Sequence, residues 1–192
     1  VLLGDYVSGM RWRSGTVEPA TWAAELARLS APLGVHAILG NHDYWDDRAA
    51  LRRRDGQNAS SSALAAAGIP VYLNQAVRLA KGGRPFWLAG LGDQVAYPLG
   101  RRRYLGADDL PKTLAAVTDA APVILLAHEP DVFAQPTDRV ALTLSGHTHG
   151  GQVRILGYAP IVPSQFGSRF AYGHIIENDQ HLIVSGGLGC SG

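Results

Sequence analysis

Short apolar runs typical of β-strands recur along this chain, and helical stretches separate the first of them. The runs cover residues 1–3, 35–39, 71–73, 86–89, 123–127, 141–144, 175–176 and 182–184. Early runs alternate with helical stretches, whereas the later ones follow each other directly. This order predicts an α/β fold in which a mixed sheet packs against helices and ends in antiparallel strands.

Helix and turn signals divide the rest of the chain. Three helices are predicted, at residues 19–29, 60–67 and 108–117; Gly68 ends the second, and Pro111 lies in the first turn of the third. Two hairpin turns are predicted, with the sequences Lys-Gly-Gly-Arg at 81–84 and Glu-Asn-Asp-Gln at 177–180.

Length and composition limit the class of protein. A chain of 192 residues fits one domain, and no run approaches the ~18 apolar residues of a membrane span. The 17 Lys and Arg nearly balance the 16 Asp and Glu, so we predict no specific nucleic-acid binding. The single Cys190 excludes an internal disulfide and is expected to be inert. Arginine runs at 52–54 and 101–103 are expected to be solvated surface, with phosphate steering as the alternative.

Polar side chains able to bind metals follow four of the apolar runs directly. They are Asp5, the triplet Asn-His-Asp at 41–43, the pair His-Glu at 128–129 and the triplet His-Thr-His at 147–149. Loops that leave the carboxyl ends of neighbouring strands converge on one crevice in a layered α/β fold, so these motifs are expected to meet. Each motif alone has a structural explanation, such as a turn or a buried histidine, but their joint occurrence at strand ends favours one site.

The chemistry of these side chains indicates a metal site. His147 and His149 are two residues apart on an extended segment, so both imidazoles project to the same side. Asp5 offers a carboxylate able to bridge two cations, and Asn41 offers a neutral amide oxygen. Together with His128, this mixture of imidazole, carboxylate and carbonyl donors suits zinc, iron or manganese.

The ordered motifs resemble the signature of calcineurin-like metallophosphoesterases. The matching residues are Gly-Asp at 4–5, Gly-Asn-His-Asp at 40–43, His128, and Gly-His-Thr-His at 146–149. The longer stretches 4–7, 40–44, 146–152 and 187–189 resemble a bacterial subgroup whose members are tethered to the inner membrane or exported across it. That subgroup includes phosphodiesterases and a UDP-diacylglucosamine pyrophosphatase.

The resemblance implies two mixed β-sheets sandwiched between helices and a pair of divalent metal ions, Mn, Fe or Zn. In that scheme Asp5 bridges both metals, and Asn41, His128 and His147 complete the second metal. His149 ligates the first. The family's Asp-x-His motif, which supplies two further ligands to the first metal, is absent here, so only one well-liganded site is expected.

Two neighbouring residues are implied to be catalytic. By the same resemblance, His42 does not bind metal but stabilises developing charge or protonates the leaving oxygen, and Asp43 orients its imidazole. The implied reaction is hydrolysis of a phosphodiester or pyrophosphate bond by a hydroxide bridging metals ~3.5–4 Å apart. The expected substrate is a small-molecule or lipid-linked phosphate ester.

The expected organisation is a single metallophosphoesterase domain over residues 1–192. It looks truncated at both ends, lacking the first strand with its Asp-x-His motif and the C-terminal end. Membrane association, if it follows the subgroup, would come through a segment absent from this chain.

Two other functions remain as alternatives. One is a catalytically silent phosphoesterase fold used as a protein-binding scaffold, and the other is a metal-dependent amide or ester hydrolase. Among the remaining polar residues, His36, His174 and His181 are expected to be structural or exposed. Asp93, which follows another apolar run, is expected to line the pocket without binding metal.

Overall fold

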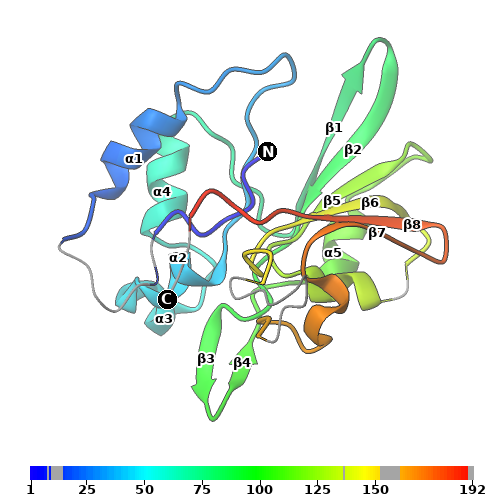
Figure 1. Cartoon of the computed structure of the whole chain (residues 1–192). Coiled ribbons are helices and arrows are strands. Elements are labelled where there is room, and N and C mark those ends of the chain that lie inside the picture. Colours follow the sequence, from blue (N-terminus) through cyan, green and yellow to red (C-terminus); the bar gives the residue numbers. More distant parts are fainter. Residues whose placement is uncertain (8, 10–14, 136, 152–160, 190–192) are drawn as a thin grey trace.

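A six-stranded mixed sheet forms the centre of the structure, a computed structural model that describes residues 1–192 except 8, 10–14, 136, 152–160 and 190–192 (Figure 1). In spatial order its strands are β1 (Gln75–Lys81), β2 (Arg84–Gly90), β5 (Val123–Leu126), β6 (Val140–Ser145), β8 (Gln180–Val184) and β7 (Gly173–Glu177). Gln152 of the longer motif and Cys190 lie outside the described residues.

The pairing of these strands confirms the mixed α/β fold. The neighbours β2, β5, β6 and β8 are parallel, and the outer strands β1 and β7 pair antiparallel with β2 and β8. Both predicted hairpin turns are present, because Lys81 pairs with Arg84 and Glu177 pairs with Gln180. The sheet therefore ends in antiparallel strands, as its sequence indicates.

The first three apolar runs form less regular structure than expected. Among the described residues they meet only as isolated parallel bridges, from Leu2 to Ala37 and from Ala37 to Val71. The Ala37 carbonyl oxygen accepts a hydrogen bond from Tyr72 N at 2.9 Å, and Ala37 N donates to the Pro70 carbonyl oxygen at 3.0 Å. The second of the two expected sheets is thus reduced to these contacts, because only two backbone hydrogen bonds join each pair of neighbouring runs.

Five α-helices and two 3₁₀ turns accompany the strands in the described part of the chain. They are α1 (Pro19–Leu26), α2 (Asn41–Trp45), α3 (Arg48–Arg53), α4 (Ala59–Ala66), α5 (Leu110–Ala115), η1 (Pro130–Ala134) and η2 (Gly167–Phe170). The predicted helices correspond to α1, α4 and α5; α1 and α5 are shorter than their sequence patterns, and α4 has the predicted length, shifted by one residue. The short α2 and α3 were not predicted, and none of the described helices has the length and apolar character needed to cross a bilayer.

The helices pack in two groups. Helices α1 and α4 lie together on the side of the bridged runs, where Trp22, Leu64 and Ala37 share one apolar cluster (Figure 1). Helix α5 covers one face of the six-stranded sheet, where Leu110 packs with the buried Leu125. A second small sheet, formed by β3 (Tyr97–Gly100) and β4 (Arg103–Leu105), projects from the body as a hairpin. This arrangement brings the ends of β5, β6 and the first two runs to one edge.

Candidate metal centre

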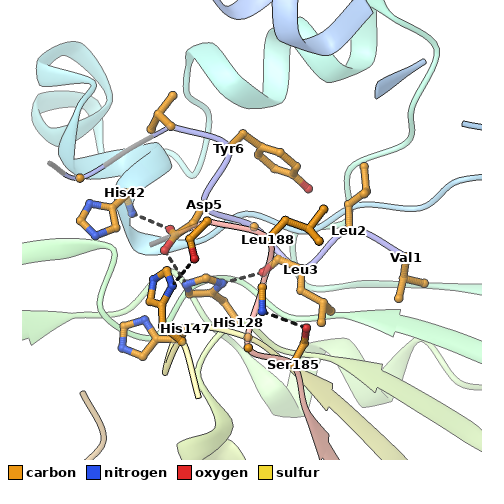
Figure 2. A pocket seen from close by; sticks show the side chains of 18 of the residues that line it. Val1, Leu2, Leu3, Asp5, Tyr6, His42, His128, His147, Ser185 and Leu188 are labelled. Atoms are coloured by element: carbon orange, nitrogen blue, oxygen red, sulfur yellow. Dashed lines mark hydrogen bonds and ion pairs between the residues drawn. The ribbon is translucent and has the colours of Figure 1, made fainter. Parts of the chain in front are cut away.

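The predicted ligands lie where the central parallel strands end. His128 follows β5 and His147 follows β6, and the two loops are joined by a hydrogen bond from Gly146 N to His128 O of 3.0 Å. Asp5 and Asn41 follow the bridged runs around Leu2 and Ala37. Figure 2 shows Asp5, His128 and His147 turned toward one another. The strand-end argument from the sequence is therefore confirmed in space.

Four of the five predicted ligands converge on one point. Donor atoms of Asp5, His128 and His147 all lie within 4.8 Å of one another. The Asp5 Oδ2 atom is 3.1 Å from His128 Nε2, and Asn41 Oδ1 is 3.0 Å from His147 Nδ1. His149 lines the same cavity but is outside this group, and its Nδ1 lies 3.3 Å from the Gly189 carbonyl oxygen.

The surroundings of His128 fit a bound cation. Its Nδ1 lies 2.6 Å from the Leu3 carbonyl oxygen, so that nitrogen carries the proton and donates. Its other nitrogen, Nε2, is buried and lies 3.1 Å from Asp5 Oδ2, where the neighbouring carboxylates favour a proton on it in the metal-free protein. A divalent cation bound between Nε2 and this carboxylate would take the place of that proton.

Burial and neighbouring charges shift the pKa values of the proposed ligands. Burial would raise the pKa of Asp5, but the neighbouring His128 and His42 hold that pKa well below its usual range, so the carboxyl is ionised. Burial lowers the pKa of His147, which keeps its imidazole neutral, the form that ligates metal. Burial also opposes the charge on His128, yet Asp5, Glu129 and Asp93 together raise its pKa.

His42 lies at the start of α2 beside the cluster. Its backbone N donates to Asp5 Oδ1 at 2.9 Å, and its ring meets the Trp45 ring edge-on with centroids 5.2 Å apart. Gly9 also lies directly against the ring, because a Cβ built on Gly9 would be 1.9 Å from His42 Cε1. The imidazole is thus placed at the cavity by its aromatic neighbour and by a close backbone approach.

Asp43 has a different role from the one expected. Its carboxylate accepts hydrogen bonds from the backbone N of Asp5 and Gly40, both at 2.9 Å, and from Tyr6 N at 3.1 Å. Among the described contacts none joins it to the His42 imidazole, so the expectation that Asp43 orients that ring is not supported. Burial, followed by the charge of Asp5, raises the pKa of Asp43 to about 6. Asp43 ties the two ligand-bearing loops together.

Backbone geometry at the ligands is unusual. Asp5, His147 and His149 have φ values of 60°, 64° and 51°, in the left-handed region that non-glycine residues seldom occupy. At Gly40 a side chain would have no room, since a Cβ there would be 2.4 Å from Asp5 Oδ1 and 2.6 Å from His128 Cε1. Glycine at this position lets two ligands approach the backbone of the third loop.

An open cavity of about 470 Å³ leads to these residues. Its lining combines Asp5, His42, His128, His147 and His149 with apolar residues of the first run and the glycine-rich stretch near Leu188 (Figure 2). The polar atoms therefore lie at one end of a cavity with largely apolar walls. A phosphate ester with an apolar or extended group would find room in it.

Other polar residues do not enter this cavity. His36 is buried, with its ring nitrogens 2.8 Å from Tyr72 Oη and 2.7 Å from the Leu33 carbonyl oxygen, as a structural histidine would be. His174 and His181 lie across β7 and β8 with ring nitrogens 2.9 Å apart.

Two carboxylates that were not predicted as ligands lie behind the ligands. Asp93 is fully buried rather than lining the cavity, and Glu129 is 4% exposed. Both lie close to His128. Glu129 directly follows a predicted ligand in sequence, which is the signal that could have identified it.

Comparison with known proteins identifies a matching family profile and several relatives. A sequence profile described as calcineurin-like phosphoesterase matches residues 1–151. The chain is 36% identical over 167 residues to the uncharacterized metallophosphoesterase YkuE of Bacillus subtilis, an alignment covering 85% of this chain and 52% of that protein. It is 34% identical over 170 residues to an uncharacterized metallophosphoesterase of Aquifex aeolicus, covering 88% and 59%. It is 31% identical over 175 residues to the phosphodiesterase YaeI of Escherichia coli, covering 85% and 54%.

The chain spans between 52% and 59% of the length of these three relatives. No solved structure matched it. The profile covers every residue of the candidate centre, from Asp5 through His149. This chain belongs to the calcineurin-like phosphoesterase family.

Proposed function

We propose that the protein containing this chain is a metal-dependent hydrolase of phosphate esters, and that residues 1–192 form one metallophosphoesterase domain. The observation that carries the proposal is the convergence of Asp5, His128 and His147 within 4.8 Å at the ends of neighbouring strands. The proposed ligands are these three with Asn41 and His149, and the proposed cations are two divalent ions, Mn, Fe or Zn. A protein-binding scaffold would have no need for this donor set.

When bound, such cations supply a nucleophile at neutral pH and neutralise charge on the phosphoryl oxygens. The residues of the chain hold the donors in place. Asp5 directs Oδ2 toward His128, while its Oδ1 accepts from the His42 backbone N. Asn41 fixes His147 through the 3.0 Å contact between Oδ1 and Nδ1. Asp43 joins the Asp5 and Gly40 loops, so the two sides of the centre move together.

His42 is proposed to act directly on the substrate. Its ring lies at the cavity next to Asp5 without belonging to the cluster of donor atoms (Figure 2). From that place an imidazolium can stabilise charge on the phosphoryl group or give a proton to the leaving oxygen. Asp43 contributes indirectly, through the backbone that carries His42.

The proposed substrate is a phosphodiester or a pyrophosphate, carried by a small molecule or a lipid. The Escherichia coli relative is named a phosphodiesterase, which favours a diester. The apolar walls of the 470 Å³ cavity would accommodate an alkyl or nucleoside group beside the phosphate. Relatives of Danio rerio and Bos taurus are named transmembrane proteins with a metallophosphoesterase domain. We therefore propose a membrane-associated or exported location, reached through a segment outside this chain.

Hydrolysis of an activated phosphodiester in the presence of added Mn²⁺ tests the proposal. A nucleotide-sugar pyrophosphate and a phosphomonoester should be assayed in parallel. We expect turnover of at least one of them, loss of activity on chelation and recovery when Mn²⁺ is restored. Activity that chelation leaves intact would exclude metal-dependent chemistry.

A further inference from the structure

The tip of the β3–β4 hairpin is built on a strained turn. Gly100 pairs with Arg103, so Arg101 and Arg102 form a two-residue turn, and their φ values are 52° and 56°. Turns with positive φ at both central positions are normally built from pairs such as Asn-Gly, because larger side chains are strained in the left-handed region. Formation of the hairpin alone therefore does not explain the two arginines, which points to a role for their side chains.

The arginines at the tip place positive charge on one part of a nearly neutral chain. The formal net charge is +1, whereas residues 94–107 contain three arginines and no acidic residue. All three arginines are exposed, and in the described part of the chain none of them makes a salt bridge. The run at 52–54 differs, because Arg53 pairs with Asp55. The hairpin tip thus offers uncompensated positive charge to an anionic partner.

Apolar side chains are exposed beside these arginines. Leu99, Tyr104 and Leu105 are 45%, 41% and 47% exposed, on a hairpin that projects from the body (Figure 1). The leucines distinguish between anionic partners. The phosphate backbone of a nucleic acid would leave them in water, whereas a bilayer has charged headgroups directly above an apolar interior. The mixture of side chains therefore favours a membrane surface.

The base of the hairpin is fixed relative to the cavity. Tyr104 stacks on Trp45 with ring centroids 5.7 Å apart, and Trp45 meets the His42 ring with centroids 5.2 Å apart. On the other strand, Tyr97 Oη accepts a hydrogen bond from Gly56 N at 3.0 Å. Two ring contacts thus connect the hairpin to His42, so a surface that binds the tip would lie at a set distance from the cavity.

We propose that the β3–β4 hairpin docks on a bilayer surface rich in anionic phospholipids. Its arginines bind the headgroup phosphates, and Leu99 and Leu105 enter the apolar boundary beneath them. A basic residue near an anionic membrane raises affinity roughly fivefold, so three arginines give about a hundredfold. The inference does not depend on the proposed metal chemistry. It places a membrane contact within the described residues, in addition to the proposed segment outside this chain.

Flotation of the 192-residue chain with lipid vesicles tests the proposal. We expect binding to vesicles of equal parts phosphatidylcholine and phosphatidylglycerol but not to phosphatidylcholine alone, and added salt should weaken it. Arg101→Asn combined with Arg102→Gly should weaken binding about 25-fold, because two charges are lost. Its melting temperature should be unchanged or higher, since Asn-Gly suits this turn. Leu99→Gln should also weaken binding, by a factor that does not depend on salt.

The matched control is Lys81→Gln combined with Arg84→Gln, which removes two charges from the tip of the β1–β2 hairpin and should retain binding. Equal losses in the two double variants would show that net charge governs binding and would overturn the proposal. So would equal binding to both kinds of vesicle, binding to neither, or capture by duplex DNA without vesicle binding. None of these outcomes bears on the metal centre, which Mn²⁺-dependent hydrolysis tests separately.

Discussion

The carboxylate of Asp43 accepts from three backbone N–H groups in two separate loops, those of Asp5, Tyr6 and Gly40. Leaving buried donors without an acceptor costs about 1–3 kcal/mol each. We therefore expect Asp43→Ala to lower the free energy of unfolding by about 3 kcal/mol and to weaken cation binding, because Asp5 loses its anchor. Urea denaturation and metal titration measure the two effects. Asp43→Asn keeps one acceptor oxygen and should lose less of both; equal losses would show that the charge, not the number of acceptors, matters.

The contact between Gly9 and His42 allows catalysis to be separated from metal binding. Ala at position 9 would place Cβ within 1.9–2.6 Å of ring atoms, so the imidazole must move. We expect Gly9→Ala to reduce turnover with little change in metal content. His42→Ala should have the same kind of effect, with turnover lowered by about two to four orders of magnitude. Gly15→Ala is the matched control, because nothing lies within 4 Å of its added Cβ. Metal loss in His42→Ala equal to that in His147→Ala would mean that His42 is a ligand.

At the scale of elements, Asp119 joins β1 to β2 and to the loop before β5. It accepts from Trp87 Nε1 at 2.7 Å, Arg78 Nε at 2.9 Å and Ala121 N at 3.0 Å. These contacts, with the Trp87 hydrogen bond first, lower its pKa to about 2. A lowered folded-state pKa stabilises the fold above the unfolded value of about 3.9, and that stabilisation is lost as the pH falls toward 2.

Thermal unfolding across pH tests this junction. Asp119→Asn should lower the melting temperature at pH 7 and make it less dependent on pH between about 4 and 2 than in the unmodified protein. Asp109→Asn offers a comparison, because Asp109 caps α5 through Lys112 N rather than joining strands. If Asp119→Asn lowers the melting temperature by the same amount at every pH, the ionisation of Asp119 does not contribute to stability.

The elements that sequence predicted well are those with local signals. The hairpin turn at 81–84 has two glycines, and the strand after it contains the apolar run at 86–89. The strand before it, β1, was not among the predicted runs, because Gln75, Arg78 and Lys81 interrupt its apolar residues. Helix α2 was missed because its five residues are the Asn-His-Asp motif itself, with no apolar period to mark it. The hairpin of β3 and β4 was missed because Pro98 and the arginines at its tip resemble a loop. Its stability comes from a nonlocal contact, the stacking of Tyr104 on Trp45 at 5.7 Å.

The candidate centre was predictable where residue type and strand end coincide, as at Asp5, Asn41, His128 and His147. The partners of Asp43 and the position of Glu129 were not, because both depend on which loops face each other across the fold. A sequence motif indicates which donors are present. The direction of each side chain depends on packing between segments more than 30 residues apart, as in the 35-residue separation of Glu129 from Gln94.

For the whole molecule, the proposed ligands divide unequally between two cations. Asp5, Asn41, His128 and His147 can fill one coordination sphere, whereas Asp5 and His149 leave the other mostly to solvent. We expect this chain to retain about one transition-metal ion after dialysis. Binding should weaken as the pH falls toward 5.5, because protons compete with the metal for the imidazole nitrogens. Elemental analysis at pH 7.5 and 5.5 gives the test; two tightly held ions, or none in a folded chain, would contradict the division.

The left-handed backbone at Asp5, His147 and His149 has an evolutionary consequence. Each such residue costs of order 1 kcal/mol or more in conformational energy, which glycine at the same position would not. Genetic drift without selection for catalysis should therefore favour glycine or asparagine at these positions, and lineages that abandon the chemistry would gain thermal stability there. At all three positions this chain carries Asp or His, the side chains that the proposed metal chemistry needs, at a cost in stability.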